Sequence, residues 1–117
     1  MTAPHYPLKI GGVAKHNNHQ TQVLSPYDGR ILATVETANG DDVNHALSIA
    51  SALYSDRKNW LTVPKRIAIL EKAISIMSEQ DEQLALASAD EGGKPLIDSR
   101  VEMARCIDSI RLCVDAL

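Results

Sequence analysis

The sequence predicts an α/β chain in which hairpin-like strands and turns in residues 1–37 precede about four helices in residues 38–117. Up to residue 37, short apolar stretches alternate with polar residues and are separated by turn sequences. From residue 38 onward, apolar residues recur at the three- and four-residue spacing of helices. The 117 residues fit one small domain, and because the chain has no Phe, its modest core is expected to consist of Leu, Ile, Val and Ala.

Two turn sequences organise the first region. Gly11-Gly12 and Asp28-Gly29 favour tight turns, and Pro26 favours an extended approach to the second turn. Two hairpin-like units are therefore predicted, joined by a polar tip at residues 15–20. Their strands are expected at residues 8–10, at Val13, and at residues 22–24 and 31–35.

The first helix is expected to begin at Asn39 or Asp41, since either side chain can cap its amino terminus. The second is expected to open at residues 62–64, with Pro64 in its first turn, where proline is tolerated. The apolar positions of the first helix are Val43, Ala46, Leu47, Ala50, Leu53 and Tyr54.

The second helix, residues 64–79, is unusually apolar around its circumference. Its apolar residues cover about half of the helix surface, which is more than the ~100° stripe of a simple surface helix. We therefore expect it to pack against neighbours on two sides. The main stripe consists of Ile67, Leu70, Ile74 and Met77, and Ile69, Ala73 and Ile76 widen it.

Two further helices are expected around a glycine pair. The third runs from about Glu79 to Glu91 and ends at Gly92-Gly93, and the fourth starts near Pro95 and continues toward Leu117. No Gly, Asn or Pro is present to cap the end of the fourth helix. Its expected apolar positions are Val101, Ala104, Ile107, Ile110 or Arg111, and Val114.

Charge and hydropathy exclude several classes of function. The net charge is −3 and the basic residues are scattered, so the chain lacks the basic stripe typical of nucleic-acid binding. No apolar run approaches the ~20 residues of a membrane span. Residues 1–7 lack the features of a signal peptide, so a cytoplasmic location is expected.

The sequence Gly92-Gly93-Lys94 invites comparison with a phosphate-binding loop. A Walker loop requires an earlier glycine, a Ser or Thr after the lysine, and a preceding strand. Here Pro95 follows Lys94 and a helix precedes the glycines. We therefore interpret one glycine as the left-handed end of the third helix and Pro95 as the start of the fourth.

Other candidate sites also have simpler interpretations. His16 and His19 could ligate a metal ion, but no third ligand lies nearby in the sequence, which favours a solvated loop. The carboxylates of Asp90, Glu91 and Asp98 fall at expected helix ends and are expected to be exposed.

Cys106 and Cys113 are the two possible thiol nucleophiles. Seven residues of helix separate them by about 10 Å along the axis, whereas a disulfide needs Cα atoms within about 7 Å, so no bridge is expected. Neither has a neighbouring His, and both lie in a helix whose apolar residues recur at helical spacing. We therefore expect both cysteines to serve as small buried hydrophobic residues. The residues alone thus predict no catalytic, cofactor-binding or metal-binding site.

Five segments in order resemble the amino-terminal region of the NAD(P)-dependent aldehyde dehydrogenase superfamily, from about Leu8 to Leu117. Ser25 stands where the family more often has Asn. The segments are "IGG" at 10–12, similar to I-x-G; "SPYDGRILATV" at 25–35, similar to NP-x-x-G-x-x-I-x-x-V; "DDVNHALSIA" at 41–50; Trp60 and Pro64 with "KRIAIL" at 65–70; and "EGGKPLIDSRVEMARCIDSIR" at 91–111, similar to E-x-G-K-P-x-x-x-A-x-x-E-V-x-x-x-I-D.

The resemblance implies that residues 1–117 form the leading part of a coenzyme-binding domain, with the catalytic domain absent. In complete members a thiolate attacks the aldehyde, hydride passes to NAD or NADP, and water releases the acid. The family's nucleotide-binding glycines, general-base Glu and nucleophilic Cys lie beyond these residues, so the chain alone is expected to be inactive. Its implied partner is the remainder of such an enzyme, which would form a homo-oligomer. The alternative is a stand-alone helical interaction module that binds a partner or itself.

Overall fold

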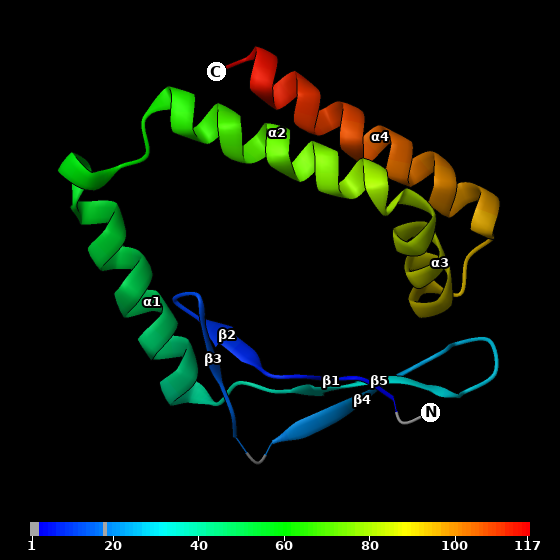
Figure 1. Cartoon of the computed structure of the whole chain (residues 1–117). Coiled ribbons are helices and arrows are strands. Elements are labelled where there is room, and N and C mark those ends of the chain that lie inside the picture. The colour runs from blue at the N-terminus through cyan, green and yellow to red at the C-terminus, as the bar shows by residue number, and fades with distance from the viewer. Residues whose placement is uncertain (1–2, 18) are drawn as a thin grey trace. The chain divides into compact units, whose positions relative to one another are not determined.

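The computed structural model describes residues 3–17 and 19–117, and the chain divides into two compact units, Met1–Trp60 and Leu61–Leu117. The first unit contains the strands and one long helix, and the second contains three helices (Figure 1). Within the described ranges, no helix has both the length and the apolar character that crossing a membrane requires.

A three-stranded sheet in the first unit has the order β1-β5-β4. Strand β4 (Gln20–Leu24) pairs antiparallel with β5 (Ile31–Glu36), which confirms the predicted second hairpin. Strand β1 (His5–Tyr6) pairs parallel with the other edge of β5, with His5 opposite Thr34. The sequence did not predict β1, because two residues are too few for an alternating pattern and the partner strand lies far along the chain.

The first predicted hairpin is also present. Strands β2 (Leu8–Ile10) and β3 (Val13–Lys15) pair antiparallel, with Ile10 opposite Val13. Gly11 and Gly12 both have positive φ angles, 58° and 82°, as a two-residue type I′ turn requires. This turn needs glycine because other L-residues rarely adopt positive φ.

Helix α1 (Gly40–Ser55) follows β5 and begins with a reciprocal cap. The Asn39 side chain accepts a hydrogen bond from the Asp42 amide, and the Asp42 side chain accepts one from the Asn39 amide. Of the two caps that the sequence allowed, Asn39 and Asp41, the structure therefore has Asn39. The predicted apolar side of this helix is open to solvent, with Leu47 62% and Leu53 67% exposed, whereas Ile49 is half-buried.

The second unit is made of α2 (Val63–Glu79), α3 (Asp81–Gly92) and α4 (Leu96–Asp115). Helix α4 packs along α2 and against α3 (Figure 1). Pro64 lies in the first turn of α2, and Gly93 ends α3 in the left-handed conformation with φ of 62°. The predicted helices are confirmed, with boundaries shifted by one or two residues.

The covered stripe of α4 differs in part from the prediction. Val101 is 44% exposed and Ala104 is exposed, so these two expected apolar positions are not among the covered residues of α4. Residues three or four apart share one face of a helix. The covered face of α4 has this spacing, but it begins at Leu96 and does not include Val101 or Ala104. Its buried or half-buried members are Leu96, Ser99, Met103, Ile107, Ile110 and Val114.

The core is aliphatic, as predicted, but it is small. Among the described residues the buried hydrophobic side chains are Ala33, Ala85 and Ile107. On α2 the main predicted stripe is half-buried, whereas Ile69 and Ile76 are 54% and 41% exposed. One part of the broad apolar surface of α2 is therefore covered within the second unit and the other part is open.

Candidate functional site

The glycine pair before α4 serves as a helix junction. Gly93 takes the left-handed position and its amide donates to the Ala89 carbonyl. The Lys94 ammonium pairs with the carboxylate of Glu102, in the second turn of α4. Lys94 is therefore paired with a side chain of α4 just after the end of α3, which supports the interpretation of Gly92-Gly93-Lys94 as a helix junction.

The carboxylates at the helix ends are exposed, as expected for Asp90, Glu91 and Asp98. The cysteine prediction is half right. Cys106 and Cys113 form no disulfide, but both are exposed, so the expectation that they are buried is wrong. Each precedes a covered residue of α4, and one helical residue corresponds to a rotation of about 100°, which turns both thiols off the covered face.

Residues 15–20 were predicted to be a polar tip, and three consecutive ones, Lys15, His16 and Asn17, bind other parts of the first unit. The Lys15 ammonium pairs with Asp42, whose side chain is fully buried at the start of α1. The Asn17 side chain donates to the Thr37 carbonyl at 2.8 Å. Asn18, also part of the predicted tip, lies outside the described residues.

Asp42 remains ionised through this contact. The hydrogen bond from Lys15 lowers the pKa of Asp42, and the bond from the Asn39 amide lowers it further, which together outweigh the opposing effect of burial. A buried carboxylate without such partners would be costly. The Lys15 pair therefore joins the β2–β3 hairpin to the amino terminus of α1.

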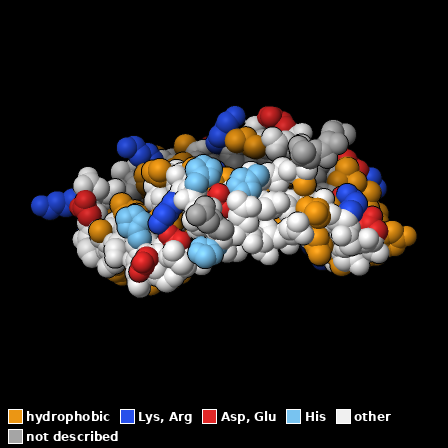
Figure 2. All heavy atoms as spheres, turned by 90° about the horizontal axis from the view of Figure 1, so that it is seen from below, with side chains coloured by type: hydrophobic (Ala, Val, Ile, Leu, Met, Phe, Trp, Pro, Cys, Tyr) orange, Lys and Arg blue, Asp and Glu red, His pale blue; other side chains and the backbone are white. Residues whose placement is uncertain are grey.

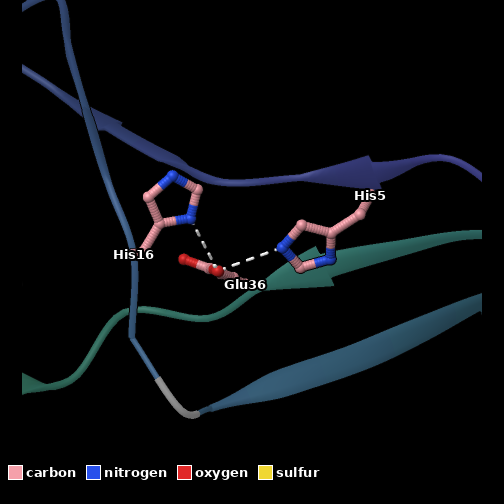
Figure 3. A group of neighbouring side chains, drawn as sticks. All are labelled: His5, His16 and Glu36. Carbon is pink, nitrogen blue, oxygen red and sulfur yellow. Dashed lines mark hydrogen bonds and ion pairs between the residues drawn. The ribbon is translucent and has the colours of Figure 1, made fainter.

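A second buried carboxylate, Glu36, lies between two histidines (Figure 3). Its Oε1 atom is 3.0 Å from His5 Nε2 and 3.2 Å from His16 Nδ1. Its Oε2 atom accepts a hydrogen bond of 3.0 Å from the Asn17 amide. Burial tends to raise the pKa of Glu36, but the hydrogen bonds from His5, the Asn17 amide and His16 outweigh it, so the pKa is lowered.

These three side chains come from separate parts of the first unit. His5 belongs to β1, Glu36 ends β5, and His16 follows β3. His16 and His19 are both exposed, as expected, but His16 has Glu36 and His5 as neighbours. His5 and Glu36 were not predicted to be site residues, because 31 residues separate them and no local spacing connects them. Histidine side chains open to solvent are visible in Figure 2.

The second unit contains a hollow of about 340 Å³ beside α3 and α4. Arg100 donates from Nε to Glu82 Oε2 at 2.8 Å and from Nη2 to Glu82 Oε1 at 2.5 Å on its wall. The Arg100 guanidinium lowers the pKa of Glu82. Both side chains are about half exposed, so this ion pair contributes little to stability, and the hollow has no buried charged group.

Comparison with known sequences gives a consistent result. The sequence model of the aldehyde dehydrogenase family matches residues 13–117. Malonate-semialdehyde dehydrogenase 1 of Bacillus licheniformis is 33% identical over 93 residues, 78% of this chain and 19% of that protein. Malonate-semialdehyde dehydrogenase 2 of Oceanobacillus iheyensis is 30% identical over 111 residues, 92% of this chain and 22% of that protein.

Solved structures show the same fold. Aldehyde dehydrogenase 21 of Physcomitrella patens, solved with the reaction product succinate, matches 99% of this chain and 24% of its own with a TM-score of 0.86 and 24% identity. A 1-pyrroline-5-carboxylate dehydrogenase from Thermus with bound NAD matches 92% of this chain and 21% of its own, with a TM-score of 0.82 and 27% identity. This chain spans about a fifth of the length of the curated relatives.

Proposed function

The chain belongs to the aldehyde dehydrogenase family, and from this we propose that it serves as the amino-terminal part of an NAD(P)-dependent enzyme that oxidises an aldehyde to a carboxylic acid. The match over residues 13–117, combined with a span of about a fifth of the relatives' length, is the observation that carries the proposal. Two of the relatives named above are malonate-semialdehyde dehydrogenases.

We assign no catalytic, cofactor-binding or metal role in that reaction to this chain. The junction at Gly93 offers no phosphate loop, since Lys94 pairs with Glu102 and Pro95 lacks an amide proton. The exposed thiols of Cys106 and Cys113 have no histidine on α4 beside them. The nicotinamide cofactor of the complete enzyme, NAD or NADP, would therefore be held by other residues. We place the protein in the cytoplasm.

The exposed apolar residues of α2 support a structural role. Ile69 and Ile76 lie on the same side of the helix, seven residues apart, and are not covered by the second unit itself. Burying apolar side chains is favourable, at roughly 25 cal/mol for each Å² removed from water. We propose that the remainder of the dehydrogenase covers this side of α2 and that the completed enzyme is a homo-oligomer.

The first test is an assay of the purified chain with NAD or NADP and a panel of aldehydes. We expect no formation of reduced cofactor, because the reacting groups are proposed to lie elsewhere. Turnover by this chain alone would overturn the proposal.

The second test is complementation. The malonate-semialdehyde dehydrogenase of Bacillus licheniformis would be prepared without the segment that matches this chain, and the chain would be added. We expect NADH formation to be restored and to be lost with Ile69→Glu and Ile76→Glu. Ala68→Glu places the same charge on an exposed position about 100° around α2 and is expected to keep the activity.

The same exposed side chains favour a second candidate, a helical module that binds a partner or itself. Large exposed apolar surfaces commonly mark interaction sites. Light scattering after size-exclusion chromatography would separate the two. Stable self-association that Ile69→Glu abolishes, together with failed complementation, would favour the module, whereas a monomer that complements would favour the dehydrogenase role.

A further inference from the structure

The cluster of His5, His16 and Glu36 brings three metal-ligating atoms together in the first unit. One donor atom from each residue lies within 4.8 Å of the other two. The Glu36 Oε1 atom is 3.0 Å from His5 Nε2 and 3.2 Å from His16 Nδ1 (Figure 3). Ligand atoms about 2.0–2.2 Å from a tetrahedral zinc ion are roughly 3.3–3.6 Å apart, which is close to the two distances that Glu36 Oε1 makes, and the two histidine nitrogens lie within 4.8 Å of each other.

The backbone holds two of these residues in fixed positions. His5 lies in β1, where it is paired with Thr34 of β5, and Glu36 ends the same strand β5. The Asn17 amide binds Glu36 Oε2 at 3.0 Å and leaves Oε1 directed at the histidines. Hydrogen bonds to the atoms of a ligand that do not touch the metal are what orient ligands in known metal sites.

Exposure differs among the three side chains in a way that suits ion binding. The Glu36 side chain is 3% exposed, whereas those of His5 and His16 are 39% and 70% exposed. The buried carboxylate of Glu36 supplies the negative charge. The exposed side chains of the two histidines leave the cluster accessible to an ion from solvent and leave room for a water ligand. Three protein ligands with one open position is a common zinc arrangement.

We propose that His5 Nε2, His16 Nδ1 and Glu36 Oε1 form a site for a divalent ion of the zinc type. Two imidazoles and one carboxylate suit Zn²⁺, Co²⁺ or Ni²⁺, whereas Mg²⁺ and Ca²⁺ prefer oxygen ligands alone. The site lies entirely within the first unit and does not depend on the proposed dehydrogenase function. It departs from the sequence-based expectation of no metal, which considered ligands near His16 along the chain.

The same three residues could instead act only as a clamp in which the histidines hydrogen-bond to Glu36. The two roles differ in a measurable way, because a clamp has no saturable affinity for a metal ion. The chain also provides its own controls. His19 and His45 are the two remaining histidines of the sequence, both exposed and neither part of the cluster.

The test is isothermal titration of the untagged chain with Zn²⁺, repeated with Co²⁺ while its visible absorption is recorded. We expect one ion per chain and the absorption bands of four-coordinate Co²⁺. His16→Ala should weaken binding at least about tenfold, since the loss of even an orienting residue costs 10–100-fold. His19→Ala and His45→Ala should leave the affinity unchanged, and Mg²⁺ should not compete.

Glu36→Gln removes a buried hydrogen-bonded carboxylate and is therefore a poor test, because it would also destabilise the sheet. A measurement on the unchanged chain is used in its place. Zn²⁺ should shift the imidazole NMR signals of His5 and His16 in the unchanged chain and leave those of His19 and His45 in place. The absence of saturable Zn²⁺ binding, or binding that His19→Ala weakens as much as His16→Ala does, would overturn the proposal and leave the clamp.

Discussion

The two units of the molecule are stabilised in different ways. The first buries two carboxylates, Glu36 and Asp42, and surrounds each with basic or amide partners. The second, among its described residues, buries no charged side chain and instead covers Ala85 and Ile107. Its ion pairs, such as that of Glu82 with Arg100, are at the surface.

This difference indicates which perturbation each unit should resist. Buried ion pairs and hydrogen bonds require a particular arrangement of partners and a particular charge state. Aliphatic helix packing depends mainly on volume and on the helix termini. The first unit should therefore be sensitive to pH, and the second to the loss of buried methyl groups. The three experiments below test this contrast.

The largest effect is expected from truncating the core of the second unit. Ile107 is 8% exposed on the covered stripe of α4, and Ile→Ala substitutions in cores cost about 2–5 kcal/mol of unfolding free energy. Urea unfolding followed by helix circular dichroism would measure it. Leu112→Ala is the control on the same helix, since Leu112 is 68% exposed and should change stability by less than about 0.5 kcal/mol.

If Ile107→Ala does not fold, Ile107→Val provides a milder change of about 0.5–1.5 kcal/mol. Equal effects at positions 107 and 112 would contradict the view that the covered stripe of α4 stabilises the second unit.

The second-largest effect is expected from acid, which should lower the stability of the first unit. The lowered pKa of Asp42 means that the folded chain binds fewer protons than the unfolded chain near pH 4. Stability supplied by Asp42 is therefore present above its ordinary pKa of 3.8 and is lost as the pH falls through the lowered folded value. Hydrogen exchange at pH 7 and at pH 3 would locate the loss in β2, β3 and the start of α1.

Asp42→Asn should be less stable than the unchanged chain at pH 7 and should lose less stability on acidification. Glu82→Gln is the matched change in the second unit, where the exposed pair with Arg100 should make little difference. An unchanged pH dependence in Asp42→Asn would show that the buried carboxylate does not control the acid response.

The smallest change in stability is expected from substituting the two glycines at the end of α3. Gly93 has a φ of 62°, so Gly93→Ala should cost about 1–2 kcal/mol. Gly92 lies within the helix and a Cβ there would approach only the Lys94 side chain, at 3.7 Å, so Gly92→Ala should stabilise by about 0.5–1 kcal/mol. Thermal unfolding of the two variants should shift in opposite directions. An unchanged or raised unfolding temperature of Gly93→Ala would show that the left-handed cap is not required.

Much of the local structure was predictable because it depends on neighbours in the sequence. The Gly11-Gly12 turn, the Asn39 cap and the Gly93 junction each follow from the dihedral or hydrogen-bonding preferences of one or two residues. The family was likewise identified from short segments in order, and the family match confirms it. The breadth of the apolar surface on α2 was also evident from its periodicity.

What the sequence could not predict depends on contacts between distant residues. The exposure of Cys106 follows from which face of α4 meets α2 and α3, and several apolar residues made more than one face plausible. The short strand β1 exists because β5 offers it an edge.

The sequence by itself determined where turns, caps and helices occur, since backbone geometry and local hydrogen bonds decide these within a few residues. Only the tertiary structure decided that His5, His16 and Glu36 meet. That contact requires the parallel pairing of β1 with β5 and the anchoring of Asn17 to Glu36, neither of which leaves a periodic signal. A cluster formed from three separate elements becomes visible only when the chain is folded.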